Sequence, residues 1–257
     1  MPRLTNRRAT EEDDEGFYVS MSDMLTGLLF IFIILLVYYA VHFRQKEVEL
    51  TGAKEARSRL LNRLEDRMRN RGIPVKIVDA TGVLRFSDPV DKMSTKILFS
   101  DRSSTLTPYG EKAVAALADE LMAVLPCYTD EPKYTQKCEE VAQFKIDVLL
   151  IEGHSDKRRF FDGGSEDRNL ELSAQRAITT YKALRNQQPS LDALKTEVGS
   201  GDEKQMTQIL SVSGYGGTRP AFGYDGDDAA SLAVNRRIDL RFLMATPDVT
   251  VKKANQP

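Results

Sequence analysis

The sequence lacks tryptophan, and it has only two cysteines, two histidines and no excess of basic over acidic residues. The missing tryptophan excludes nothing. Because 36 basic and 38 acidic side chains leave a net charge of -2, the charge balance does not favour direct binding of nucleic acid. Cys127 and Cys138 are too few for a structural zinc site, and neither is near a histidine. We therefore expect no metal and no cofactor.

Long apolar runs are scarce as well, since the chain has one, at residues 17–43, with Asp23 as its single acidic residue. At about 1.5 Å per residue, a helix over this run is roughly 40 Å long, enough to cross a hydrocarbon core of about 30 Å. The run is too long for a secretory signal peptide, and no small-residue cleavage site follows it. We expect one transmembrane helix over residues 17–43, and the 257 residues leave room for one globular domain.

Asp23 lies between one and two turns inside this run, and Thr26 and Gly27 share its helix face. A carboxylate at that depth costs on the order of 3 kcal/mol, so it usually faces a protein interior and carries protons or ions. A glycine lets a neighbouring helix approach, and a threonine hydroxyl can hydrogen-bond across the contact. We predict that Asp23 is protonated from one side of the membrane and releases the proton to the other as its access changes. An aspartate that snorkels to the interface or caps the helix is the alternative.

The segments that flank the apolar run are polar. Residues 1–16 carry three arginines followed by acidic residues, which predicts a disordered tail. Residues 44–72 are charged and helix-prone, which indicates a helical linker that either pairs weakly with another helix or stays solvated. Residues 247–257 are expected to form a loose tail. More basic residues follow the run than precede it, which mildly favours a cytoplasmic C-terminus.

Residues 73–246 alternate between strand and helix patterns, which predicts a single α+β domain with its own core. Thr107 and Pro108 suit the N-cap and first position of a helix that ends near Val124. A second amphipathic helix is expected over residues 172–184. The expected strands are residues 75–78 and 83–86, joined by a hairpin turn, and residues 97–99, 145–152, 209–213 and 238–244.

Cys127 and Cys138 bracket a polar loop between the first predicted helix and the strand that begins at Lys145. This arrangement suits a disulfide in an oxidising compartment, whereas two free thiols in a reducing cytosol are the alternative. A disulfide in the domain opposes the topology that the flanking basic residues favour.

The segment around Asp23, SDMLTGLLF, resembles the transmembrane segment of flagellar stator B subunits of the MotB type. In that family a single membrane aspartate precedes a threonine by three positions and binds the permeating proton. The resemblance implies the same role for Asp23 and Thr26.

A second set of motifs resembles the OmpA-like peptidoglycan-binding domain over most of residues 96–244. The motifs are IEGHSD at 151–156, Asn169, LSAQRA at 172–177, GYG at 214–216 with Pro220, and NRRI at 235–238. The resemblance implies that Asp156 takes the amine of a diaminopimelate side chain and that Arg176 takes its carboxylate. Supporting roles in peptidoglycan binding fall to Asn169, Leu172 and Arg237. An Asp156–Arg176 salt bridge that only holds the fold is the alternative, and His154 is expected to be structural.

Together the resemblances imply a proton-driven stator B subunit of the bacterial inner membrane. Its N-terminus would be cytoplasmic, and its OmpA-like β-α-β-α-β-β domain would be periplasmic, where a disulfide between Cys127 and Cys138 is reasonable. The implied partners are peptidoglycan, protons, a second copy in a homodimer, and a pentameric ring of MotA-like membrane subunits.

Two features are more similar to the B subunit of the Zorya anti-phage defence system, whose ring partner is of the ZorA type. Acidic residues at 11–15 stand where flagellar B subunits usually have basic ones, and an insert separates the two cysteines. A flagellar stator subunit and a passive wall tether are the alternatives. We expect no enzyme, because no catalytic pair or metal set is present. Long loops at residues 157–167 and 197–208 leave the glycan ligand open.

Overall fold

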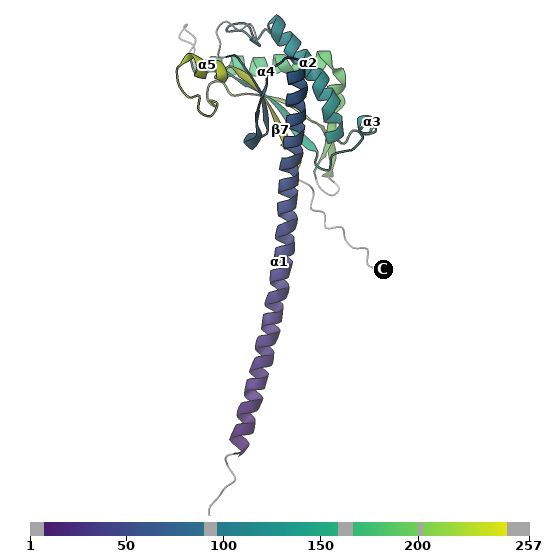
Figure 1. The fold of residues 1–257 in the computed structure, drawn as a ribbon, viewed down its shortest axis with the longest axis vertical. Coiled ribbons are helices and arrows are strands. Elements are labelled where there is room, and N and C mark those ends of the chain that lie inside the picture. Colours follow the sequence, from purple (N-terminus) through teal and green to yellow (C-terminus); the bar gives the residue numbers. More distant parts are fainter. Residues whose placement is uncertain (1–7, 90–96, 159–166, 200–202, 246–257) are drawn as a thin grey trace, which may run out of the picture. The chain divides into compact units, whose positions relative to one another are not determined.

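The computed structural model describes residues 8–89, 97–158, 167–199 and 203–245. Contacts divide the chain into two units, Met1–Thr51 and Gly52–Pro257, and helix α1 (Arg8–Asn70) contributes residues to both (Figure 1). The predicted C-terminal tail at 247–257 and the first seven residues of the N-terminal tail lie outside the described residues.

The first unit contains the apolar run. Among the described residues, one helical segment is long and apolar enough to cross a membrane, Tyr18–Arg44. Helix α1 begins at Arg8, so a tail that is disordered through residue 16 is not what the structure shows for residues 8–16. The acidic composition of residues 11–15 suits the start of a helix, because negative charge is favourable near the positive end of the helix dipole.

The C-terminal part of α1 belongs to the core of the second unit. Arg67 of this part and Arg71, directly after the end of the helix, both pair with the buried Glu120. The compact unit begins at Gly52, which corrects the prediction of a separate linker over 44–72 and of a domain that begins at 73. This part of α1 packs into the domain because it carries an apolar stripe, and burial of each large side chain in the stripe contributes about 1.5–3 kcal/mol of stability. Its fully buried members are Leu60, Leu61, Leu64 and Met68.

The second unit is built on a sheet whose described strands lie in the order β1-β2-β7-β3-β6. Strands β1 (Lys76–Val78) and β2 (Val83–Ser87) form the predicted hairpin around η1 (Asp79–Thr81). Strand β7 (Arg237–Met244) pairs antiparallel with β2 and with β3 (Ile146–His154), and β3 pairs parallel with β6 (Leu210–Gly214). This mixture of helix and sheet confirms the predicted α+β class.

Two helices lie over the sheet. Helix α2 (Pro108–Val124) begins as predicted, because the Thr107 hydroxyl accepts a hydrogen bond from the Gly110 N–H. Helix α4 (Asp167–Gln187) packs on β3 and β6, and α2 packs on α4 (Figure 1). Glycines permit this close approach, since a Cβ on Gly153 or Gly214 would lie only 1.9 or 2.6 Å from α4 backbone atoms. The carboxyl ends of β3 and β6 therefore lie against the first turns of α4.

Four short helices and strands were not predicted, and one predicted strand is nearly absent. The expected strand at residues 97–99 is reduced to an isolated pairing of Phe99 with Leu106. The unpredicted elements were missed because their sequences have little apolar periodicity. They are α3 (Pro132–Thr135), the separate β4–β5 hairpin (Lys195–Val198 and Gln205–Gln208), and α5 (Ala229–Asn235).

A disulfide joins Cys127, in the 3-10 segment η2 (Leu125–Tyr128), to Cys138. The bridged loop docks on β4, because the Asp130 carboxylate accepts hydrogen bonds from the Thr196 hydroxyl at 3.0 Å and from the Glu197 N–H at 3.1 Å. A further 3-10 segment, η3 (Pro189–Ala193), leads from α4 into β4.

Candidate functional site

Asp156 lies just after β3, where the parallel strands β3 and β6 end at one edge of the sheet. Backbone hydrogen bonds hold this edge together, from the Ser155 N–H to the Gly216 carbonyl and from the Tyr215 N–H to the Gly153 carbonyl. Since the first turns of α4 lie against the same edge, the motif residues of β3, α4 and the loop after β6 gather in one place.

The carboxylate of Asp156 is nearly buried, with 7 % of the residue exposed, and cations surround it. It accepts a hydrogen bond from Arg158 Nη2 at 2.7 Å and another from Arg236 Nη1 at 3.0 Å. Burial acts to raise the pKa of Asp156, but the hydrogen bonds from Arg158 and Arg236 outweigh burial and lower the pKa below its ordinary value. Asp156 is therefore held as an anion at neutral pH.

Arg236 links Asp156 to a second carboxylate, that of Asp88. The Arg236 Nε lies 2.8 Å from Asp88 Oδ2, and the Asp88 N–H donates to the Arg236 carbonyl. Burial raises the pKa of Asp88, and hydrogen bonding to Arg236 opposes that rise. Sequence reasoning missed both residues. The one available signal for Arg236 was the alternation of β7, because Arg237 begins the strand and turns inward whereas Arg236 precedes the strand.

Arg176 is the buried cation of the site, with 5 % of the residue exposed. Its Nε donates to the Ser103 carbonyl at 2.9 Å, and its guanidinium lies 5.0 Å from the centre of the Phe99 ring. Burial lowers the pKa of Arg176, and the nearby Asp88 and Asp156 act in the opposite direction. Among the described residues Arg176 and Asp156 form no ion pair, so a salt bridge between them is not what holds the fold.

The two residues predicted on α4 lie near this cluster. The side-chain amide of Asn169 donates to the Arg158 carbonyl at 2.9 Å, which holds the main chain after Asp156 against the helix. Leu172, one turn further along α4, is half-buried. The Asn169 contact brings the start of α4 to the main chain that follows β3.

Arg237, predicted to support ligand binding, lies in the interior and makes no contact with Asp156 among the described residues. Only 5 % of the residue is exposed, and its guanidinium donates to Asp239, Asn235 and the Arg219 carbonyl. The cause is strand geometry, because side chains alternate between faces and Arg237 begins β7 on the same face as Asp239. Arg236, the preceding residue, contacts Asp156 instead.

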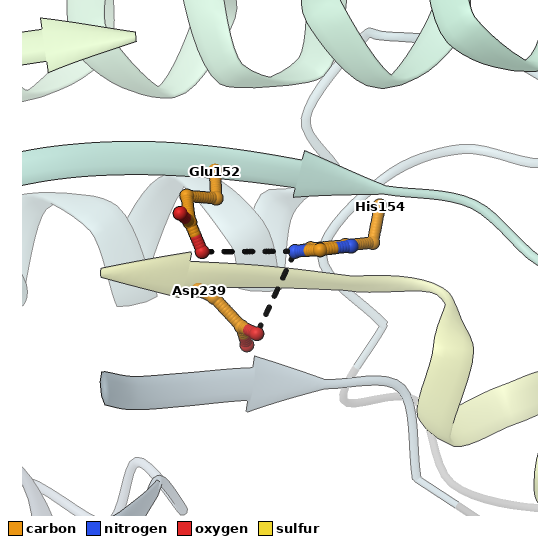
Figure 2. A group of neighbouring side chains, drawn as sticks. All are labelled: Glu152, His154 and Asp239. Carbon is orange, nitrogen blue, oxygen red and sulfur yellow. Dashed lines mark ion pairs between the residues drawn. The ribbon is translucent and has the colours of Figure 1, made fainter. Parts of the chain in front are cut away.

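A buried charge network stands on the same face of β3 and β7 as Arg237. Figure 2 shows the His154 imidazole beside two carboxylates, with His154 Nε2 at 3.9 Å from Glu152 and 3.6 Å from Asp239. By distance these three side chains could hold a metal ion. However, each carboxylate already accepts two hydrogen bonds from an arginine. Arg241 donates to the two oxygens of Glu152 at 2.7 and 2.8 Å, and Arg85 donates to the two oxygens of Asp239, both at 2.8 Å. The arrangement is that of a charge network that fixes the end of β3.

His154 makes this network sensitive to pH. Burial lowers the pKa of His154, although Glu152 and Asp239 act in the opposite direction and Arg237 reinforces burial. For Glu152, burial acts to raise the pKa, but His154 and Arg241 outweigh it and lower the pKa to about 2. Glu152 therefore loses its charge only in strong acid, whereas the folded chain resists protonation of His154 because burial lowers the pKa of the imidazole.

We expect the free energy of unfolding to fall as pH is lowered from 7 to 5. Below about pH 6.5 the unfolded state binds a proton on His154 that the folded state resists, so the slope reaches at most about 1.4 kcal/mol per pH unit. Urea unfolding of the chain at pH 5, 6 and 7 measures this slope, and His154→Gln should flatten it. Equal slopes in the two proteins would show that His154 is not the responsible group.

The second predicted site, Asp23 with Thr26, belongs to the first unit. Both residues are exposed in this chain, and the Thr26 hydroxyl donates to the Ser22 carbonyl one turn earlier, at 2.7 Å. The Asp23 carboxylate is therefore carried on the outer surface of the apolar segment Tyr18–Arg44. In hydrocarbon an uncovered carboxylate is costly, so this position calls for a neighbouring protein surface.

No family model matches the chain, and no curated protein matches it. Among solved structures it is similar to a MotB-like protein from Desulfovibrio vulgaris, with 17% identity over 76% of this chain and 94% of that chain and a TM-score of 0.47. It is also similar to the periplasmic domain of Helicobacter pylori MotB (17% identity, 65% and 78% covered, TM-score 0.40). A third such structure is the cell wall anchor of the T6SS from Pseudomonas aeruginosa, with 17% identity over 72% of this chain and 97% of that chain and a TM-score of 0.42. Similarity at this level concerns the fold and does not transfer a ligand or a partner.

Proposed function

We propose that the chain is a membrane-anchored subunit that grips peptidoglycan through the cluster around Asp156 and Arg176. The observation that carries the proposal is the separation of charge in this cluster. A buried carboxylate and a buried guanidinium occupy the OmpA-like motif positions at one edge of the sheet, without being paired to each other.

Such a pair matches the zwitterionic end of a diaminopimelate side chain. The Asp156 carboxylate receives the ligand's ammonium group, and the Arg176 guanidinium receives its carboxylate through charge-assisted hydrogen bonds. Asn169 and Leu172 flank the ligand from α4. Binding of this kind needs neither a nucleophile nor a metal, so the proposed role is anchoring and not enzymatic.

The membrane segment extends the proposal to an ion-driven complex. Asp23 carries a permeating proton, and its exposure in the single chain is removed by a second copy and by a pentameric ring of MotA-like subunits. The N-terminus is then cytoplasmic, and the domain with its disulfide is periplasmic, on the outer side of the bacterial inner membrane. One charge crossing the membrane is worth about 2.3 kcal/mol per 100 mV, so the passage of a few protons is enough to shift a two-state conformational equilibrium.

Within this class, the acidic residues at 11–15 favour the B subunit of the Zorya anti-phage defence system, with a ZorA-type ring, over a flagellar stator subunit of the MotB type. Plaque counts on cells with and without the chain and its partner separate the two roles, because a flagellar subunit changes swimming and leaves plaque counts unaltered.

The wall-binding part is tested by co-sedimentation of the full chain with purified sacculi. Asp156→Ala removes the charge that receives the ammonium group, and we expect affinity to fall about tenfold or more, the scale of a lost charged hydrogen bond. Arg176→Ala should act alike. Lys157→Ala is the control, since the Lys157 amine goes to Asp227 and to the Asp225 carbonyl.

Asp156→Asn, with a thermal unfolding curve for each variant, separates lost binding from lost folding. If Asp156→Ala and Arg176→Ala chains fold and sediment with sacculi as the unaltered chain does, the proposed site is wrong.

A further inference from the structure

The Asp156 carboxylate is already fully engaged by this chain's own cations. The backbone N–H of Arg158 donates to Oδ1 at 3.0 Å. In its guanidinium, Nε donates to both oxygens at 3.2 Å and Nη2 donates to Oδ2 at 2.7 Å. Arg236 adds Nη1 at 3.0 Å. A carboxylate offers about four lone-pair positions, so an incoming ammonium group finds no free acceptor until one of these donors leaves.

The two arginines differ in how firmly they are held. Arg236 has 29% of its side chain exposed and is tied on its other side to Asp88 at 2.8 Å. Arg158 has 60% of its side chain exposed, and within the described residues the hydrogen bonds of its guanidinium go to Asp156. Because most of the Arg158 side chain already lies in water, its guanidinium is readily rehydrated when it leaves Asp156, and Arg236 remains on the carboxylate.

We propose that Arg158 is a tethered competitor that occupies the ammonium position of the site and sets which ligands can enter it. The proposal rests on the proposed binding of peptidoglycan at Asp156. Because Arg158 lies two residues from Asp156 in the chain, it is present at high effective concentration whenever the site is empty. Its backbone N–H can remain on Oδ1 while only the guanidinium swings away.

This competition determines specificity. A simple amine offers one charge and three donors to Asp156, which gains little over the bidentate guanidinium it must displace. A ligand that also presents a carboxylate to Arg176 gains a second charged contact. That contact makes displacement of the Arg158 guanidinium from Asp156 favourable. The structure thus favours a ligand end that carries an ammonium and a carboxylate together, and it disfavours lysine-type side chains, whose amine has no neighbouring carboxylate.

The experiment measures binding of a meso-diaminopimelate tripeptide to the full chain in detergent. With Arg158→Ala we expect about fivefold tighter binding, equivalent to about 1 kcal/mol, because the competitor is gone. Arg158→Lys keeps the charge but loses the bidentate contact, so its affinity should lie between the two. Lys157→Ala removes a neighbouring positive charge without freeing Asp156 and should bind as the unaltered chain does.

A second probe isolates the ammonium group. With the side-chain amine of the tripeptide acetylated, the gain in Arg158→Ala should disappear, because nothing then competes for Asp156. Unchanged or weaker binding of the free tripeptide by a folded Arg158→Ala chain overturns the proposal, as does an equal gain with the acetylated probe. Failure of the unaltered chain and of every variant to bind either probe would instead count against the proposed function itself.

Discussion

Replacing Asp23 with asparagine is expected to abolish proton flux through the complex proposed above while leaving membrane insertion and the proposed wall binding intact. Asparagine has nearly the same shape, but it cannot gain and release a proton. Since Asp23 is the only acidic residue in residues 17–43, the segment offers no second carboxylate to take over. Cytoplasmic acidification of cells that express the chain with its ring partner, followed with a pH-sensitive fluorescent protein, measures the flux.

Asp23→Glu is the matched control, because it retains a titratable carboxyl group on a longer side chain and should keep part of the flux. Thr26→Ala tests the second predicted residue. Its hydroxyl is engaged by the Ser22 carbonyl, so we expect a smaller loss than for Asp23→Asn. Full flux in the Asp23→Asn complex would remove the reason for treating the chain as more than an anchor.

Replacing Asp239 with alanine is expected to destabilise the domain by about 3–5 kcal/mol, the cost of breaking a buried ion pair from one side. Asp239 is 1 % exposed, and its removal leaves Arg85 and Arg237 without their carboxylate. Urea unfolding monitored by circular dichroism gives the difference in the free energy of unfolding. The loss should also weaken sacculus binding, because Arg237 and Arg236 are adjacent at the start of β7.

Asp147→Ala on β3 provides the comparison. Asp147 is the same residue type, is half-buried, and takes part in no ion pair within the described residues, so its removal should cost less than about 0.5 kcal/mol. Equal effects of the two substitutions would mean that the buried network adds nothing specific to the fold.

The elements with strong periodicity or clear end signals could be predicted from the sequence. Thr107 and Pro108 mark the start of α2, and the apolar run in β3 and the alternation in β7 gave strands within two residues of their observed ends. The β4–β5 hairpin could not be found in this way, because its second strand, Gln205–Gln208, is exposed along its whole length and has no buried face to leave a pattern.

The positions of Asp156 at the end of β3 and of Arg176 on α4 could be predicted, because a motif fixes each residue relative to its strand or helix. The candidate site was not predictable where two equivalent residues adjoin. Arg236 and Arg237 are identical in type, and only the register of β7 against β3, with Arg237 opposite His154, decides which of them turns inward. The role of Arg158 depends on the path of the chain after Asp156, for which the sequence carries no periodic signal.

The burial of the last turns of α1 has a practical consequence for anyone preparing the soluble part alone. A fragment cut at residue 73 would lose Leu60, Leu61, Leu64 and Met68, all fully buried, and would leave Glu120 without Arg67 and Arg71. The apolar core surface that these side chains cover would then be exposed to water, and we expect such a fragment to aggregate. A fragment that starts upstream of Gly52 keeps these side chains and is the one to purify.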